Sequence, residues 1–220
     1  MSLKGDYNPK KIKDIKATLL RPALTSHFAI KIQPPPDLIK FLQNEARFGG
    51  QFSQTYLDNL VILCESATLP GSTLYTHEVT NDFPGVTERM AYRRQYDNQS
   101  SFTFQVDQNY DIIEFLEGWK NFIVNEDDQK LFKTRQASYR MKFKNQYAGE
   151  IAVTKFERNQ GVKEDKQADS KILNYTFVDA FPISIDSMPV SYETGTVLKC
   201  SVNFTYTRYV RQRILGSPTK

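Results

Sequence analysis

The sequence predicts a mainly β fold, either a β-sandwich or a barrel-like arrangement, with one packed α-helix. Several segments of strand length alternate apolar and polar residues, which is typical of strands with one buried face. The composition agrees, because 12 Tyr and 15 Phe among 220 residues favour strands. The strand-like segments also follow one another without the strand–helix–strand order that a parallel sheet requires. About eight strands are therefore expected.

The length and the net charge restrict the classes of protein to which this chain can belong. A chain of 220 residues suits one large domain with a sizeable core. Its 29 basic and 25 acidic residues give a net charge of +4, which is too balanced to indicate nucleic-acid binding by itself. The N-terminus, MSLKGDYNPKKIKDIK, lacks the apolar segment of a secretory signal, and no apolar run is long enough to span a membrane. We therefore expect a cytosolic product with reduced thiols and no membrane insertion.

Residues 1–22 are expected to form an N-terminal helical arm. Its helix, at 8–20, begins with an Asn-Pro pair, in which the proline suits the first helical position. Ile12, Ile15 and Leu19 share one apolar face of this helix. A short amphipathic helix at a chain end needs a surface that covers this face. The three apolar residues are therefore candidates for docking a partner, which is either the arm's own domain or a neighbouring subunit.

The main domain is expected to span residues 23–210. Its first strand, at 28–32, alternates apolar and polar residues, and three prolines end it. Residues 34–59 are expected to be an insertion that contains a helix at 38–48. The four apolar residues at 60–63 then predict a strand that leads to a Pro-Gly turn.

Residues 73–97 are expected to form a long extended β-hairpin with its turn near 81–85. Both of its faces are fairly polar, so it would be poorly buried in a monomer. An isolated two-stranded hairpin is only marginally stable in water. The hairpin is therefore expected to need a partner surface. The candidate residues for this contact are Thr76, Val79, Val86, Met90, Tyr92, Arg93 and Arg94.

The strongest helical pattern lies at residues 111–124. Asp111 and Glu114 have the spacing of a capping box at its start. An apolar stripe then recurs at helical spacing, which predicts a helix with one packed face. The stripe consists of Ile112, Phe115, Leu116, Trp119, Phe122 and Ile123.

The C-terminal part of the chain is expected to contain four strands and a tail. One strand covers 151–156. Apolar alternation at 173–177 and at 181–185 predicts two further strands, and a proline places the second at an edge or at a strand start. The last strand, at 200–207, is long. Residues 211–220 are expected to be a polar tail.

The cysteines bear on whether the chain is an enzyme. Cys64 could be a nucleophile, a redox thiol or simply a small apolar residue. A nucleophile needs a base, and His27 and His77 are the only histidines. Because Cys64 follows an apolar run and Cys200 takes an inward position of an alternating strand, burial is the favoured interpretation for both thiols. No catalytic residue is predicted, and the protein is expected not to be an enzyme.

No cofactor or metal site is predicted. The sequence lacks the clustered Cys and His residues of zinc sites and the glycine-rich loop of phosphate sites. A nucleic-acid-binding β-barrel is an alternative function, in which Phe102 and Phe104 would stack on bases. Their regular alternation with polar residues favours core packing instead. Two basic clusters, at 10–16 and 208–213, could contact phosphate or surround a protein interface, and the interface is favoured.

The order of several motifs points to one family. LLRPALTSHFAIKI, at 19–32, is followed by LCESATLPG, at 63–71, and then by the polar hairpin. FTFQVDQNYDIIEFLEGWKNFI and FPISIDSMPVSYETGTVLKCSVNFTYTRY come next. In this order the motifs resemble the tube-protein family of contractile-tailed bacteriophages. That family includes the major tail tube protein and the baseplate tube proteins that start the tube, and the resemblance covers most of 19–210.

The resemblance implies a β-sandwich with one packed helix, assembled as a homohexameric ring in a virion tail after synthesis in the host cytoplasm. The hairpin at 73–97 would join those of other subunits in a continuous barrel. The barrel would line a channel through which DNA passes without sequence-specific binding. The implied partners are adjacent tube or baseplate hub rings, with sheath and wedge proteins as further candidates.

Two features depart from a minimal tube subunit. The N-terminal helix and the insertion at 34–59 are extra, and such additions suit a ring with different neighbours above and below. A baseplate tube or tube-initiator subunit is therefore favoured. The major tail tube protein of the same tail is the alternative, and the nucleic-acid-binding β-barrel is the further alternative.

Overall fold

The computed structural model describes residues 12, 23–44, 52–80, 85, 87–124, 141–156, 171–192 and 195–215. Within these residues the fold is mainly β, as the sequence predicts. The elements are β1 (Phe28–Gln33), α2 (Pro36–Asn44), α3 (Gln54–Val61), β2 (Cys64–Ala67), β3 (Ser72–Val79), β4 (Glu88–Tyr96), β5 (Gln99–Gln105), α4 (Asp111–Val124), α6 (Lys144–Tyr147), β6 (Gly149–Lys155), β7 (Lys171–Ile185), β8 (Lys199–Thr205) and β9 (Arg208–Leu215).

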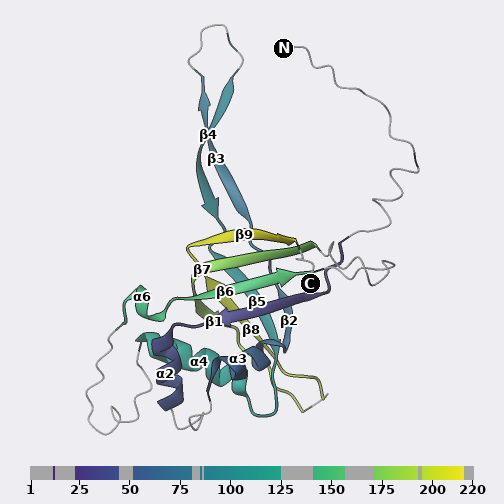
Figure 1. Cartoon of the computed structure of the whole chain (residues 1–220), viewed down its shortest axis with the longest axis vertical. Coiled ribbons are helices and arrows are strands. Elements are labelled where there is room, and N and C mark those ends of the chain that lie inside the picture. Colours follow the sequence, from purple (N-terminus) through teal and green to yellow (C-terminus); the bar gives the residue numbers. More distant parts are fainter. Residues whose placement is uncertain are drawn as a thin grey trace, which may run out of the picture.

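Two layers of strands form the body of the molecule (Figure 1). β9, β7, β6 and β1 lie across the front in this view, and β8, β5 and β2 lie behind them. All pairings in both layers are antiparallel. The path through the described strands starts at β1 and ends at β2, and these two do not pair with each other. The fold is therefore an open β-sandwich rather than a barrel closed within one subunit.

Strand β7 belongs to both layers because it bends in its middle. Its first half pairs with β6 and β9, and its second half, from Phe181 onward, pairs with β8. Asp179 lies between the halves with a φ of 57°, a left-handed conformation that Asp tolerates better than most residues. The prediction of two separate strands at 173–177 and 181–185 is wrong, because one left-handed residue redirects a strand without ending it.

Aromatic side chains from both layers and from α4 form the centre of the core. Phe102 of β5 makes edge-to-face contacts with Phe204 of β8 and Phe177 of β7, with ring centroids 5.5 and 6.3 Å apart. Trp119 of α4 packs on Phe204 with centroids 6.0 Å apart. Its indole N–H donates a hydrogen bond of 2.9 Å to the backbone oxygen of Tyr147, so its polar atom is also satisfied. These rings fix the helix against the sandwich.

Helix α4 has the predicted bounds, and all six residues of its predicted stripe are buried. A turn stabilised by Asp107 precedes it. The carboxylate of Asp107 accepts hydrogen bonds from the backbone N–H groups of Asn109 and Asp111, at 3.2 and 2.9 Å. α4 lies with α2 and α3 at the end of the body opposite the β3–β4 hairpin (Figure 1). The helical end and the hairpin end of the molecule are thus separate surfaces.

The expected insertion at 34–59 contributes to the core. Helices α2 and α3 bury Leu38, Leu42, Leu57 and Leu60, all at 6% exposure or less. The helix expected at 38–48 is α2, which ends at Asn44; residues 45–50 lie outside the described residues. The segment is therefore an integral part of the sandwich's helical end and not a peripheral addition.

The strand predicted at 60–63 is wrong. Helix α3 ends within this run, and β2 begins only at Cys64. Ser53 caps α3, because its hydroxyl oxygen accepts a hydrogen bond from the backbone N–H of Tyr56 at 3.3 Å. Leu60 is buried whereas Ile62 is 78% exposed, so the two residues do not share the face that strand alternation would give them. A short apolar run fits either structure, and here the cap selects the helix.

The polar tail expected at 211–220 begins inside a strand. β9 covers Arg208–Leu215 and pairs with β7 along its whole length, and residues 216–220 lie outside the described residues. Its polar composition suits its position, because β9 is an edge strand and charged residues protect such edges from unwanted pairing. The predicted tail is therefore wrong for 211–215, because a polar sequence is compatible with an edge strand.

Candidate assembly interface

The β3–β4 hairpin projects from the body as a two-stranded sheet of its own (Figure 1). Its register runs from Ser72 opposite Tyr96 to Val79 opposite Glu88. Val79 and Tyr96 are half-buried, and every other residue of the two strands is exposed. No other described strand pairs with either one, so the outer edge of each strand has free backbone hydrogen-bonding groups. These are the properties of an edge that pairs with another chain.

A bulge in β4 changes which side chains share a face of the hairpin. Tyr75 pairs with Arg93 and Thr76 pairs with Ala91, which leaves Tyr92 as an extra residue. Beyond the bulge the alternation is shifted by one. As a result Met90 lies on the same face as Arg93 rather than that of Arg94. Simple period-two alternation could not have predicted this arrangement.

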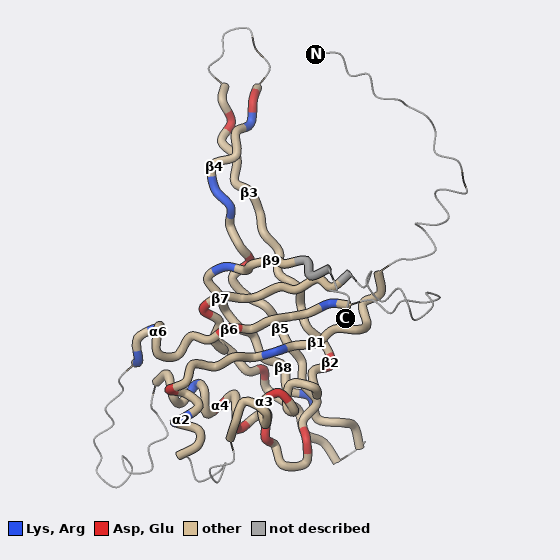
Figure 2. The backbone as a smooth tube through the Cα atoms, in the orientation of Figure 1, with Lys and Arg blue, Asp and Glu red and all other residues tan. Residues whose placement is uncertain are grey.

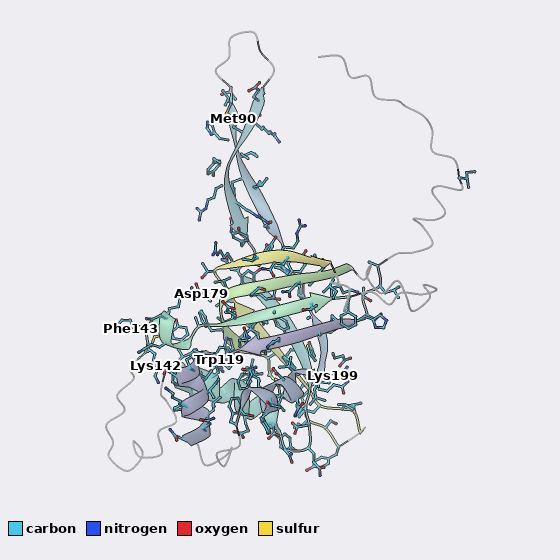
Figure 3. The ribbon with its side chains drawn as sticks, viewed as in Figure 1. Met90, Trp119, Lys142, Phe143, Asp179 and Lys199 are labelled. Atoms are coloured by element: carbon cyan, nitrogen blue, oxygen red, sulfur yellow. The ribbon has the colours of Figure 1, made fainter. Side chains whose placement is uncertain are left out.

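Large apolar side chains stand on the exposed hairpin. Leu74 is 61% exposed, Met90 is 56% exposed and Tyr92 is 68% exposed. Figure 3 shows Met90 far out along the hairpin, away from the body. Charges of both signs accompany them (Figure 2), including a cross-strand pair in which Arg89 lies 3.9 Å from Glu78. Exposed ion pairs of this kind stabilise little, so the hairpin depends on other contacts.

Arg94 fastens the base of the hairpin to β9. Its guanidinium donates two hydrogen bonds to the hydroxyl of Ser72, at 3.1 and 2.9 Å, and one to the hydroxyl of Tyr209, at 3.0 Å. It also lies over the rings of Tyr96 and Tyr209, at 4.9 and 5.5 Å. Tyr209 packs in turn on Tyr96 and Tyr175. This cluster fixes how the hairpin leaves the body.

The structure describes most of the candidate residues. Thr76 and Val79 lie in β3, and Met90, Tyr92, Arg93 and Arg94 lie in β4. Of these, Arg94 serves a contact within its own subunit. No sequence pattern indicates its partner Tyr209, which is 115 positions away. Val86, Ile15 and Leu19 lie outside the described residues; Ile12 is helical and 74% exposed.

The family model described as phage tail tube protein matches residues 23–212 of the chain. The chain belongs to the phage tail tube protein family. This confirms the resemblance drawn from the order of the sequence motifs. The family match also makes the chain a component of a phage tail.

Several solved structures are similar to this tail tube family member. A chain of the anti-feeding prophage baseplate has a TM-score of 0.49 at 9% identity, covering 87% of this chain and 96% of that chain. A chain of the sheath–tube complex of the extracellular contractile injection system PVC has a TM-score of 0.47 at 12% identity, covering 93% and 99%. An Hcp protein has a TM-score of 0.40 at 14% identity, covering 84% and 90%. No curated protein matches the sequence.

The thiols of this tail tube family member lie in unreactive surroundings. The Cys64 thiol donates to the backbone oxygens of Ser66 and Thr103, at 3.2 and 3.5 Å, and burial raises its pKa to about 12. Burial also raises the pKa of Cys200, which is fully buried. Neither thiol therefore has the lowered pKa of a nucleophile. Cys64 is half-buried, so the expectation of a buried residue there was too strong.

The described residues contain no group of three or more His, Cys, Asp or Glu side chains arranged to hold a metal ion. Among the described helices, none combines the length and the apolar character needed to cross a bilayer.

Proposed function

We propose that the chain is a subunit of a hexameric ring in the inner tube of a contractile phage tail. In this ring the outer edge of β3 in one copy pairs with the outer edge of β4 in the next. The closed set of hairpins then lines a channel for DNA. The observation that carries the proposal is the hairpin itself, whose two edges are unpaired and whose side chains are almost all exposed.

Ring closure would give each hairpin the neighbouring strands that it lacks in the single chain. A two-stranded hairpin on its own is marginal, whereas three or more strands stabilise one another. Each added neighbour pairs a further row of backbone groups, and closure of the ring removes the last two edges. The cluster around Arg94 supports this model, because barrel closure requires each hairpin to leave its body in the same direction.

Within the tube, we assign the chain to the baseplate end, as a tube-initiator ring. The family match begins at residue 23, so the N-terminal arm at 1–22 precedes the shared domain. An extra segment suits a ring that contacts a different protein on one side. The segment 34–59 no longer supports this assignment, because it belongs to the core. The major tail tube protein is the alternative, and the electron microscopy experiment described below distinguishes the two.

Base stacking on an oligonucleotide-binding barrel loses its main support. Phe102 and Phe104, the residues considered for it, are 1% and 0% exposed. Stacking of bases requires accessible rings. Their burial in the sandwich core leaves tube assembly as the function that the exposed surfaces favour.

Negative-stain electron microscopy with mass photometry on the same sample tests the proposal. We expect six-fold rings with a central hole. Single rings or short stacks would agree with an initiator, whereas long tubes would identify the major tail tube protein. A protein that stays monomeric at high concentration, and that also fails to join tube or baseplate rings supplied as a template, would contradict the proposed function.

A further inference from the structure

An apolar groove opens where the sandwich is not closed. It lies between β1 and β2, the two ends of the strand path, and has a volume of about 570 Å³. Leu24 and Leu69 are 50% and 43% exposed there, and Phe28 and Ala67 are half-buried. Glu65 and Lys155 also line it. The groove is separate from the hairpin, so the assembly proposed above does not use it.

The groove has the size and character of a docking site. Its volume lies within the range of ligand pockets, about 300–1,000 Å³, which is room for more than one side chain. It exists because β1 and β2 each pair with only one described strand, which leaves apolar side chains partly exposed along this seam. Burial of these side chains against a partner would remove apolar surface from water.

We propose that this groove receives the apolar face of the N-terminal arm of a neighbouring copy, formed by Ile12, Ile15 and Leu19. The inference rests on the proposed function, which brings copies together. An amphipathic helix in an apolar groove is a common mode of recognition, in which residues at helical spacing serve as anchors. The arm carries an apolar stripe at helical spacing in the sequence, and it ends where the groove begins, at Ala23.

The arm's own groove is a poorer site than that of another copy. Ile12 is helical but 74% exposed in the single chain, so its apolar side chain is not seated in its own body. The groove is lined by Ala23 and Leu24, which follow the arm directly. Pro22 disfavours continuation of the helix, and the chain would have to reverse within two or three residues to lay the arm back onto them. An arm from another copy meets no such constraint.

Photo-crosslinking in the full-length protein tests the assignment. p-Benzoyl-phenylalanine is placed at position 12, and equal amounts of ¹⁵N-labelled and unlabelled protein are mixed before assembly. Mass spectrometry should find position 12 joined to the groove segments 23–28 or 65–69. About half of these products should combine one labelled and one unlabelled peptide. p-Benzoyl-phenylalanine at position 17 in place of Ala17, on the opposite side of the predicted helix, should give at least tenfold less of the mixed-label product.

A groove variant sharpens the test. Leu69→Asp introduces a charge into the groove at a partly exposed position and should lower the mixed-label product at least tenfold. Val197→Asp, at a residue that is 61% exposed on the loop between β7 and β8, should leave it unchanged. Micrographs of the cross-linked protein with the unchanged groove, Leu69 included, separate the two proposals. Rings without a cross-link to the groove, or with same-label products alone, would overturn the arm's assignment and leave the ring intact. Absence of both rings and cross-links, also after tube or baseplate rings are supplied as a template, would overturn both.

Discussion

Arg94 is the residue that couples the hairpin to the body. Replacing it with Ala removes three hydrogen bonds and two ring contacts, so we expect the free energy of unfolding to fall by about 1–2 kcal/mol. Ring formation should fall by a larger factor, because the hairpin loses its fixed direction. Urea unfolding and mass photometry measure the two effects.

Arg93→Ala is the matched control for Arg94. Arg93 lies on the other face, and its side chain makes no hydrogen bond or ion pair with the described residues. Its replacement should change the free energy of unfolding by less than about 0.5 kcal/mol. If Arg93→Ala and Arg94→Ala lowered the free energy of unfolding equally, the role assigned to Arg94 would be contradicted.

Tyr206 carries a polar atom that the core does not satisfy. Its side chain is 4% exposed, and its hydroxyl has no hydrogen-bond partner among the described residues. Tyr206→Phe removes this unpaired group, so the free energy of unfolding should rise by about 1 kcal/mol. Tyr209→Phe, which loses the bond to Ser72 at 3.1 Å, should lower it instead. A fall in the free energy of unfolding of Tyr206→Phe would contradict this and indicate that the hydroxyl has a hydrogen-bond partner in the folded protein.

The thiols provide a test of pH dependence. Burial raises the pKa of Cys64 to about 12, so its neutral form predominates in the folded state at pH 8. Labelling by a thiol reagent should be at least about 100-fold slower in the native protein than in urea. The stability linked to this raised pKa is fully present below about pH 8.5, the unfolded value, and is lost as the pH rises toward 12. Rapid native labelling at pH 8 would refute the structural assignment of Cys64.

Among the elements, α3 offers the sharpest contrast between sequence and structure. In a strand through 60–63, Leu60 and Ile62 would share a face. At the end of α3 they do not, because Leu60 is 6% exposed and Ile62 is 78% exposed. We therefore expect Leu60→Ala to lower the free energy of unfolding by about 2–4 kcal/mol and Ile62→Ala by less than about 0.5 kcal/mol. Urea unfolding measures both values. Similar losses of unfolding free energy in the two variants would favour a strand at 60–63 over the end of α3.

Other elements show what the sequence could and could not predict. Helix α4 was predictable because fourteen residues carry a full amphipathic repeat. The bend of β7 depends on one left-handed residue, Asp179, which no periodicity indicates. The bulge at Tyr92 depends on how two strands pair, and strand pairing is not a local property. The hairpin was predictable as an element, whereas its anchor on Tyr209 was not.

For the whole molecule, the surfaces assigned to assembly are separate. The hairpin is proposed to close a ring, and the groove between β1 and β2 is proposed to receive an arm from another copy. Met90→Asp should leave the monomer folded, because Met90 is 56% exposed, and should abolish rings by adding a charge to the hairpin contact. Circular dichroism measures whether the monomer is folded, and mass photometry measures whether rings form. Val190→Asp, at an 86% exposed residue outside the hairpin, should still form rings.

The proposed assembly depends on pairing of hairpin edges between copies. Hydrogen exchange, compared between the monomer and the assembled protein, reports on this pairing, because pairing protects backbone amides that are free in the single chain. We expect new protection on assembly to be strongest in Ser72–Val79 and Glu88–Tyr96. Assembled rings in which these two strands exchange as fast as in the monomer would contradict it.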